Sequence, residues 1–386
     1  MTIDKTDSVT ARRKKIEQET HITLAAIGSS YSDEPLASTR HCENMIGITQ
    51  VPLGIVGPIV YKTIDSLEDT SVYIPLATTE GALVASVNRG CKAICKSGGA
   101  VVDSYQVGAT RGPVFYVRNL KESDRLNIFL DTHLAEMQKI AASTSGHITL
   151  TKIFSRGVGQ YRYVRFVYDT ADAMGLNMVT IATDAVVKFI EGQTNIFCIA
   201  LSGNYCTDKK PSWLNVIEGR GSKVWAEVIL SENVLKTILK TTAKKMYDTW
   251  LAKCMMGSMM SGSMGNNAQF ANVLAAVFLA TGQDIAHVGE CSVGMTTAEV
   301  RGKNLYMSVY LPDVMVGTVG GGTELSGQKE ALQILGCYGG DNGKNKKKLA
   351  QIVGTAVLAG EISLLASLSE GSLAGAHQKL ARGKKI

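Results

Sequence analysis

The 386-residue sequence lacks the short motifs that mark several common enzyme classes. It contains no HExxH, no zinc-type Cys/His spacing and no GxSxG, so it gives no support for a metal site or a serine hydrolase. It also lacks the GxGxxG of an ordinary Rossmann fold and the lysine-containing loop of a P-loop. We therefore expect no bound metal and neither of these two common nucleotide sites.

Paired cysteines and long apolar runs are absent as well. None of the eight cysteines belongs to a CxxC pair and no signal peptide is visible, which predicts a reduced protein of the cytoplasm. The most apolar stretches, near 271–280 and 353–368, are too short or too interrupted by charge to span a bilayer, so we expect a soluble chain. A net charge of +6 argues against pervasive nucleic-acid binding and leaves room for a basic pocket.

The composition is that of a folded protein with more than one domain. Hydrophobic residues make up 45% and charged residues 19%, which excludes a disordered or coiled-coil chain. The 39 glycines exceed the usual share of roughly 7%, which indicates tight turns or close approach of backbone to ligands. Residues 1–40 predict a small helical arm, because a polar start leads into a helical pattern without a core of its own.

The first third of the remaining chain predicts a loop, two strands and a helix. Two prolines and two glycines interrupt 51–58, which we interpret as a loop. Residues 59–64 and 71–76 predict strands, and apolar residues at helical spacing predict a helix over 78–96.

The middle third carries the clearest architectural pattern. Strands are expected at 113–118, 147–154, 161–168 and 195–201, with helices at 123–142 and 172–190. This βαββαβ order is the ferredoxin-like arrangement. We predict an α+β protein in which a ferredoxin-like domain, 112–201, is inserted into a large helix-rich α/β domain made of 41–111 and 202–386. After residue 202 the pattern predicts mainly helices, at 231–250, 267–281, 328–335 and 349–368.

Four side chains could carry acid–base chemistry. Glu80 opens the 78–96 helix, where it either complements the helix dipole or acts as a general acid. Lys209 lies in a charged turn that is either solvated or able to polarise a carbonyl oxygen. Asp284 follows an apolar helix, and His377 near the C-terminus is either structural or a proton donor.

Two glycine-containing segments could contact phosphate. Residues 172–178 are expected to open a helix directly after a strand, which would present free backbone N–H groups to an anion. The run 317–323 is rich in glycine, and taken alone it is better explained by turn packing.

Taken together, these segments resemble one family. The matching motifs, in chain order, are Glu43–Gly47, Ala77–Gly81 with Asn88–Cys91, Thr110–Pro113, Asp172–Met178, Leu201–Pro211, Ile217–Gly221, Gly282–Asp284 and Gly317–Thr323. From about residue 41 onward the chain resembles the catalytic portion of 3-hydroxy-3-methylglutaryl-coenzyme A (HMG-CoA) reductase. The Thr-Thr-Glu-Gly segment and the long run around Lys209 are similar to the class I branch, which uses NADPH.

The resemblance implies an activity and roles for the four side chains. The family reduces HMG-CoA to mevalonate and CoA with two hydrides from two NADPH molecules, in the mevalonate pathway of isoprenoid and sterol biosynthesis. Lys209 would polarise the thioester carbonyl and Glu80 would supply protons. Asp284 would tune the pair formed by Glu80 and Lys209, and His377 would protonate the departing thiolate of CoA.

The resemblance also implies binding residues and an assembly. The HMG pocket would be lined by Arg111, Ser202, Asp208, Lys210, Lys253 and Asn272, and CoA would contact Ser86, Asn88, Arg89 and Lys92. The NADPH candidates in the inserted domain and the tail are Ser155, Arg156, Asp172, Ala173, Met174, Asn177 and Arg382, of which the two arginines suit a 2′-phosphate. Family sites lie between subunits, which implies a homodimer or a dimer-based homotetramer.

Three positions depart from the family, and two alternative functions stay open. Gln269 replaces a histidine of many relatives, Ala381 replaces an asparagine, and Gly383 replaces the regulatory serine of animal relatives. The membrane-spanning N-terminal region of animal and plant relatives is not in this sequence, which is compatible with a naturally soluble form and with a shortened chain. The alternatives are the branch that prefers NADH or degrades mevalonate, and a catalytically dead relative that binds acyl-CoA or nucleotide. Retention of all four catalytic side chains argues against the dead relative.

Overall fold

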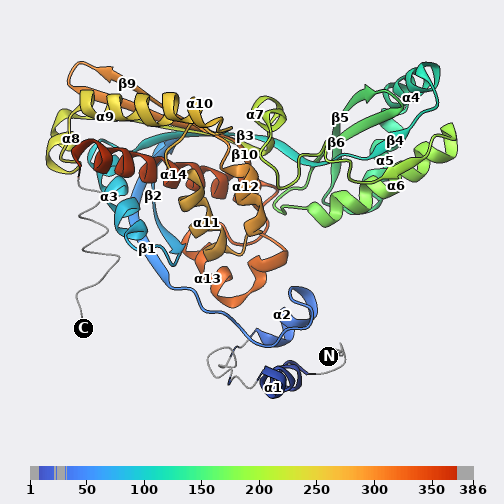
Figure 1. The fold of residues 1–386 in the computed structure, drawn as a ribbon, viewed down its shortest axis with the longest axis horizontal. Helices are drawn as coiled ribbons and strands as arrows, with labels where there is room; N and C mark the ends of the chain where they lie inside the picture. Colours follow the sequence, from blue (N-terminus) through green and yellow to red (C-terminus); the bar gives the residue numbers. More distant parts are fainter. Residues whose placement is uncertain (1–7, 21–22, 24–30, 32, 372–386) are drawn as a thin grey trace.

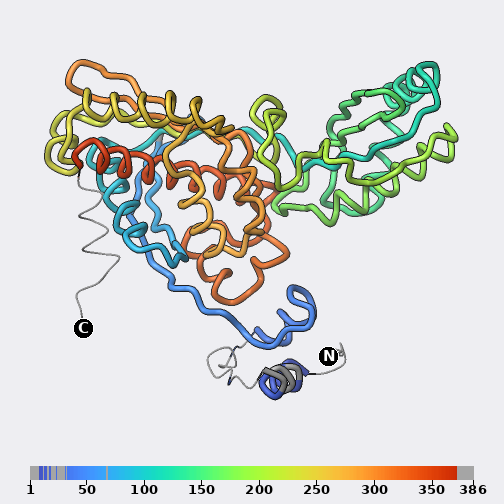
Figure 2. Tube along the Cα trace, viewed as in Figure 1, coloured from blue at the N-terminus to red at the C-terminus, as the bar shows by residue number. Residues whose placement is uncertain are grey.

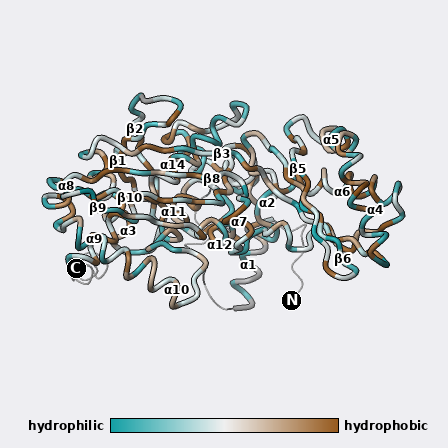
Figure 3. Tube along the Cα trace, turned by 90° about the horizontal axis from the view of Figure 1, so that it is seen from above, coloured by the Kyte–Doolittle hydropathy of each residue, from teal (hydrophilic) through white to brown (hydrophobic). Residues whose placement is uncertain are grey.

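The computed structural model describes residues 8–20, 23, 31 and 33–371. Two of the predicted site residues, His377 and Arg382, lie outside this described part. Figure 1 shows a larger body built on a sheet around a central helix, a smaller body to one side and two short helices below. The view from above in Figure 3 keeps the smaller body apart from the larger one.

The larger body contains a mixed sheet with the strand order β2-β1-β3-β8-β10-β9. Only β1 and β3 pair in parallel; the other neighbours are antiparallel. The strands are β1 (Leu53–Thr63), β2 (Ser66–Ala77), β3 (Ala100–Arg111), β8 (Arg220–Leu230), β9 (Met295–Arg301) and β10 (Asn304–Val314).

Two expectations for this body were wrong. The segment 51–58 is not a loop, because β1 begins at Leu53 and runs through it. Its pairing with β2 shifts register between Val56 and Ile59, and this irregularity accommodates the proline that a regular ladder would exclude. The chain after residue 202 is also less helical than expected, since β8, β9 and β10 were missed although β8 alternates between buried and more exposed positions.

Helix α14 (Lys344–Glu370) forms the centre of the larger body. Nearly all of its residues from Leu349 to Ser367 are buried, and it packs against α3 (Leu83–Lys96) and the sheet. At Gly90 a Cβ atom would lie 1.9 Å from the carbonyl oxygen of Ala359, so only glycine allows α3 to approach α14 this closely. Among the described residues, α14 is one helix long and apolar enough to cross a membrane, contrary to the expectation of a shorter stretch, but 83% of its most apolar window is buried inside the protein.

The remaining helices of the larger body surround this centre. They are α7 (Trp213–Glu218), α8 (Glu232–Thr237), α9 (Ala243–Trp250), the π-helix η1 (Leu251–Gly257), α10 (Ser258–Ser261), α11 (Phe270–Thr281), the 3-10 helix η2 (Ile285–His287), α12 (Val288–Cys291), the 3-10 helix η3 (Gly321–Glu324) and α13 (Ser326–Ile334).

The smaller body has the predicted βαββαβ order. Its elements are β4 (Val114–Tyr116), α4 (Leu120–Thr132), α5 (Leu134–Ser143), β5 (Thr149–Val158), β6 (Tyr161–Asp169), α6 (Leu176–Thr194) and β7 (Cys198–Ala200). The strands lie in the antiparallel order β7-β4-β6-β5, which confirms the ferredoxin-like fold. The single helix expected at 123–142 is two helices that meet at His133.

Strand β3 connects the two bodies. Its first part pairs with β8 of the larger sheet, and its last residues, Ala109–Arg111, pair with β6 of the smaller one. Figure 2 shows the chain crossing to the smaller body along this strand and returning ahead of α7. Segments on both sides of the insertion therefore meet at the end of β3.

The N-terminal arm contains α1 (Val9–Thr20) and α2 (Glu34–Arg40). In the described part of the arm, Val9, Ala37 and Met45 form a small buried cluster. Asp33 anchors the arm because its carboxylate accepts hydrogen bonds of 2.7 Å from both the backbone N–H and the hydroxyl of Ser326, at the start of α13.

Candidate active site

Lys209 lies on a strained turn just after the smaller body. The residues Asn204, Thr207 and Lys209 all have φ near +60°, a conformation that is costly for a β-branched residue such as Thr207. Buried hydrogen bonds offset this cost: Thr110 donates to the carbonyl of Cys206 at 2.8 Å, and Thr207 donates to the side chain of Asn215. The turn is thus held in one conformation, which fixes the direction of Lys209.

Asp284 meets Lys209 from a different element. The Nζ atom of Lys209 lies 2.6 Å from Oδ2 of Asp284, and both side chains are partly exposed. Asp284 caps η2 by accepting the backbone N–H of Ala286 at 3.0 Å. Burial alone would raise the pKa of Asp284, but the hydrogen bonds from Lys209 and Ala286 and the charge of His287 lower it overall. The site therefore holds an ion pair with one side open to solvent.

A buried charged cluster lies behind this pair. The guanidinium of Arg220, fully buried, forms ion pairs with Glu290 and, at 3.0 Å, with Asp208. Burial opposes charge on Glu290, but its contacts with His287 and Arg220 lower its pKa overall. Burial and the neighbouring charge of Glu290 raise the pKa of Asp313 well above its usual range.

Three members of this region could ligate a metal by residue type. Ligand atoms of Asp208, His287 and Glu290 lie within 4.8 Å of one another. Arg220, however, already donates to both carboxylates, and its positive charge disfavours a second cation there.

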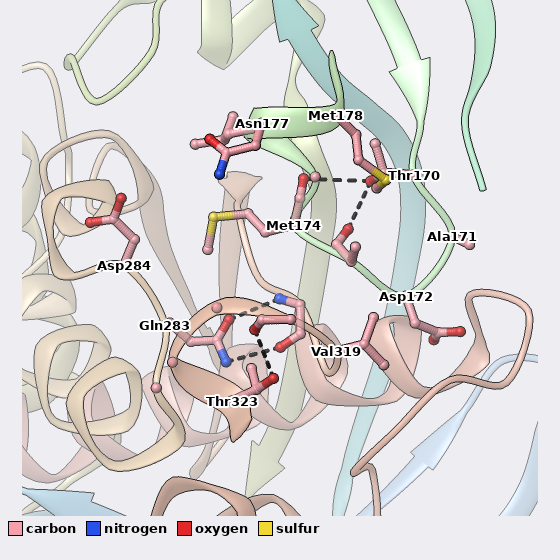
Figure 4. A pocket seen from close by; sticks show the side chains of 18 of the residues that line it. Thr170, Ala171, Asp172, Met174, Asn177, Met178, Gln283, Asp284, Val319 and Thr323 are labelled. Atoms are coloured by element: carbon pink, nitrogen blue, oxygen red, sulfur yellow. Dashed lines mark hydrogen bonds between the residues drawn. The ribbon is translucent and has the colours of Figure 1, made fainter. Parts of the chain in front are cut away.

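A pocket of about 1070 Å³ opens beside the ion pair. One wall comes from the smaller body, one from the loops that carry Lys209 and Asp284, and one from the glycine-rich loop 317–323. Figure 4 shows Met174 and Asn177 from the smaller body extending into the space that Asp284 faces from the other side. The predicted residues Lys209, Asp284, Asp172, Ala173, Met174 and Asn177 all line this pocket.

Asp172 does not open a helix, contrary to expectation. The helix α6 begins only at Leu176, after Gly175 with φ of +85°. The carboxylate of Asp172 instead accepts backbone N–H bonds of 2.7 to 3.0 Å from Asp341, Gly343 and Lys346, at the start of α14. Its oxygens are engaged in joining the pocket loop to the central helix, so the structure favours a positioning role for Asp172 over a free anion-binding helix end.

Lys346 also binds the pocket loop that contains Asp172. Its buried Nζ donates to Thr170 and to the carbonyl of Ala173, both at 3.2 Å. Burial lowers the pKa of Lys346 from 10.5 to about 8, against the opposing effect of Asp169 and Asp172.

Substituting Lys346 by methionine is expected to change how stability depends on pH. Between pH 8 and 10.5 the unfolded state binds more protons at this lysine than the folded state, so stability from this group rises with pH. Relative to Lys346→Met, the wild type should gain up to about 3 kcal/mol of unfolding free energy from pH 7 to 10.5. Urea unfolding at several pH values measures this, with the exposed-site variant Lys303→Met as control; a difference that stays constant with pH would contradict it.

Glu80 lies outside this pocket. It belongs to the turn before α3, not to the helix, and its carboxylate accepts a hydrogen bond of 3.3 Å from Asn272 on α11. Among the described residues it forms no ion pair with Lys209. The structure thus brings together Lys209 with Asp284 and, separately, Glu80 with Asn272.

The other predicted HMG residues lie in three places. Arg111 lies 3.9 Å from Asp208 and donates to Thr180 at 2.7 Å, while Lys210 donates to the carbonyl of Asp208. Ser202 contacts the buried thiol of Cys206 at 3.5 Å. Lys253 is exposed on the π-helix η1, away from the pocket lining.

All four predicted CoA residues lie on α3, and two of them contact α14. Ser86 bonds to Ser363 at 3.0 Å, and Arg89 bonds to Ser363 and to Glu370. Asn88 accepts the backbone N–H of Gly57 at 2.9 Å, and Lys92 is exposed. Three of these four side chains thus already have partners within the chain.

The remaining predicted cofactor residues lie on β5, outside the pocket lining. Arg156 is exposed, and its guanidinium donates to the backbone carbonyl of Ser155. The hydroxyl of Ser155 is buried and has no hydrogen-bond partner.

Several residues of the site were not predicted from the sequence. Arg40, His41 and His147 line the pocket as basic groups, and His287 and Glu290 lie behind Asp284. The motif containing Arg220 was noted, but nothing in its spacing indicated a buried ion pair, because its partners are distant in sequence.

The fold and the site define an α+β protein in which an inserted ferredoxin-like unit and a larger sheet body enclose a ligand pocket with a lysine–aspartate pair in its wall. A family model described as hydroxymethylglutaryl-coenzyme A reductase matches residues 8–382. The chain therefore belongs to the HMG-CoA reductase family of oxidoreductases, which confirms the resemblance.

Similar proteins agree with this assignment. The chain is 48% identical to the 3-hydroxy-3-methylglutaryl-coenzyme A reductase of Methanocaldococcus jannaschii, over 96% of this chain and 92% of that protein. It is 45% identical to the reductase of Aeropyrum pernix, over 98% and 90% of the two chains. A solved structure of a class II reductase from Streptococcus pneumoniae bound to NADPH shares the fold with a TM-score of 0.70 at 19% identity, covering 94% of this chain and 97% of the other.

Proposed function

We propose that this protein reduces HMG-CoA to mevalonate and CoA with two hydrides from NADPH, as an enzyme of the mevalonate pathway. The observation that carries this proposal is the Lys209–Asp284 pair, 2.6 Å apart, in the wall of a large pocket of a chain that belongs to the reductase family. Nicotinamide supplies the hydride when it is bound; the chain supplies orientation, charge and protons.

The pocket fits a dinucleotide in size and lining. Its volume is slightly above the roughly 300–1000 Å³ typical of ligand sites. Met174 and Asn177 offer one apolar and one amide contact, Arg40 offers positive charge for phosphate, and His41 and His147 offer ring N–H donors. The carboxylate of Asp172 accepts three backbone N–H groups, so its oxygens are engaged within the chain.

Lys209 would donate a hydrogen bond to the thioester oxygen and stabilise the charge that develops there as hydride arrives. Asp284 holds that ammonium in place, and its lowered pKa keeps the carboxylate ionised. Glu80, positioned by Asn272, would deliver protons, and His377 would protonate the thiolate of CoA.

We propose that a second subunit completes the site. Glu80, Asn272, Lys253 and the CoA residues of α3 do not line the pocket of one chain, which supports a dimer or dimer-based tetramer in which one copy supplies what the other lacks. The domain prediction assigns HMG-CoA to the larger unit, 41–111 with 202–386, and NADPH to the inserted unit, 112–201. The arm, 1–40, has no assigned ligand. The eight free thiols support a place in the reducing cytoplasm.

We place the chain in class I. Identities of 48% and 45% to the archaeal reductases exceed by far the 19% shared with the class II enzyme, which supports a branch other than class II.

Replacing Arg156 by alanine tests the choice of cofactor. If its guanidinium contacts the 2′-phosphate, the KM for NADPH should rise about tenfold or more while the KM for NADH stays the same, because only NADPH carries that phosphate. Arg118→Ala, on the same body, is a control expected to change neither. Equal changes for both cofactors would remove Arg156 from 2′-phosphate recognition.

The proposed function is tested by loss of nicotinamide absorbance with HMG-CoA, using NADPH and NADH in parallel. We expect about two NADPH oxidised per CoA released and a much poorer reaction with NADH. Preference for NADH would place the chain in the other branch. No turnover with either cofactor, from a folded oligomer, would favour the binding-only relative.

A further inference from the structure

One buried side chain beside the ion pair has no part in the roles above. His287 is fully buried at the end of η2, and its ring lies between two carboxylates. Its Nδ1 atom is hydrogen-bonded to Glu290, and its Nε2 atom lies 3.8 Å from Oδ2 of Asp284. Nε2 has no hydrogen-bond partner, although it is buried.

The arrangement follows from which atom carries hydrogen. Glu290 accepts a hydrogen bond from Arg220 and is hydrogen-bonded to Nδ1 of His287, so the ring in its neutral form places its hydrogen on Nδ1. Nε2 then has only a lone pair, and it faces the carboxylate of Asp284, which is also an acceptor. Two acceptors facing each other without a hydrogen between them explain why the gap is 3.8 Å and why Nε2 has no partner.

Charged groups lie on both sides of the His287 ring. Beyond Nε2 lie Asp284 and its partner Lys209. Beyond Nδ1 lie Glu290 and its partner Arg220. A ligand atom of Asp208, the other partner of Arg220, lies within 4.8 Å of those of His287 and Glu290. Arg220 already balances one of its two carboxylate partners. With a proton on Nε2 as well as on Nδ1, each ring nitrogen would face a carboxylate, Asp284 at Nε2 and Glu290 at Nδ1. Histidine is the side chain that changes charge most readily near neutral pH.

We propose that His287 is a positioning residue that takes up a proton at Nε2 and, as imidazolium, draws the carboxylate of Asp284 away from Lys209. The proton comes from solvent through the half-exposed Asp284; an N–H bond forms at Nε2 and no other bond in the protein breaks. The new hydrogen bond to Oδ2 competes with the bond from Lys209, which frees its ammonium for the substrate oxygen. This inference rests on the proposed function only for the last step.

Two substitutions separate the two sides of the ring. In His287→Gln the amide nitrogen reaches about as far as Nε2 and donates a hydrogen permanently toward Asp284. In His287→Asn the shorter amide reaches about as far as Nδ1, so it keeps the contact with Glu290 and loses the reach to Asp284. His133→Gln is the matched control, because His133 stacks on Phe129 between α4 and α5, away from the pocket lining.

The readout is the dependence of kcat on pH from 5.5 to 8.5. We expect kcat of the wild type and of His133→Gln to fall as pH rises through neutrality. His287→Gln should stay within about threefold of the wild-type maximum and lose this fall, whereas His287→Asn should lower kcat about tenfold with an unchanged KM for NADPH. If His287→Asn kept the wild-type kcat and His287→Gln did not, the proposal would be overturned, because only the contact with Glu290 would then matter. It would also be overturned if both variants kept the wild-type dependence of kcat on pH.

A second measurement does not depend on activity or on the variants being folded. In wild-type protein with ¹⁵N-labelled histidine rings, the Nε2 resonance of His287 should move to the protonated position as pH falls from 8.5 to 5.5. A ring that stays neutral over this range overturns the proposal. If the wild type reduces no HMG-CoA with either cofactor while this resonance still titrates, the proposed function is wrong. The uptake of a proton by Nε2 of His287 is then still confirmed.

Discussion

Replacing Lys209 by alanine is expected to lower kcat about 10²- to 10³-fold or more while the protein stays folded. The reason is that its ammonium is the cation positioned at the pocket wall, 2.6 Å from Asp284, where charge develops on the substrate oxygen. Its side chain is partly exposed, so its loss leaves no buried cavity. Steady-state reduction of HMG-CoA, with thermal unfolding alongside, measures both parts of this expectation.

The control for Lys209→Ala is Lys303→Ala, which removes an exposed ammonium 3.8 Å from Glu232, in the turn between β9 and β10 and outside the pocket lining. Because exposed pairs contribute only about 0–1 kcal/mol, this variant should keep both activity and stability. Near-normal turnover in Lys209→Ala would remove Lys209 from catalysis, whatever the control shows.

The largest loss of stability is expected when Arg220 is replaced by methionine. Its guanidinium is fully buried and bonds to Glu290, to Asp208 and, at 2.8 Å, to the hydroxyl of Thr110. Methionine leaves Glu290 as a buried carboxylate without its cation, which typically costs about 3–5 kcal/mol. The free energy of unfolding in urea measures the loss.

The matched surface variant is Arg301→Met, in which an arginine on β9 loses a 2.9 Å pair with Glu299. We expect a change of less than about 1 kcal/mol there. A loss in Arg220→Met no larger than in Arg301→Met would show that the buried cluster relaxes or admits water, and would contradict its role as a rigid support for Asp208.

Much of the fold could be predicted because it follows from local patterns. The βαββαβ order of the insert appears in the alternation of its strands and the apolar stripes of its helices, and the structure has the same order. The predictions were wrong where the local preference of a residue is outweighed by its contacts with a segment distant in sequence. The prolines and glycines of 51–58 predict a loop, yet β2 pairs with this segment and absorbs its proline at a shift of register.

The candidate site divides in the same way. Lys209 and Asp284 were predicted by family resemblance, and the structure brings them together across 75 residues of chain. Asp172 was predicted to open a helix; its carboxylate instead binds the start of α14, because three backbone N–H groups of a distant loop lie within reach. No local pattern shows such donors.

The sequence by itself determined the class of fold, the family and the candidate side chains, since these depend on residue types in order along the chain. Only the tertiary structure decided which of them meet. It paired Glu80 with Asn272 and not with Lys209, buried Arg220 between carboxylates, and placed His287 between Glu290 and Asp284. The physical reason is that burial and the approach of opposite charges depend on contacts between distant segments, and these contacts set the charge and direction of each group.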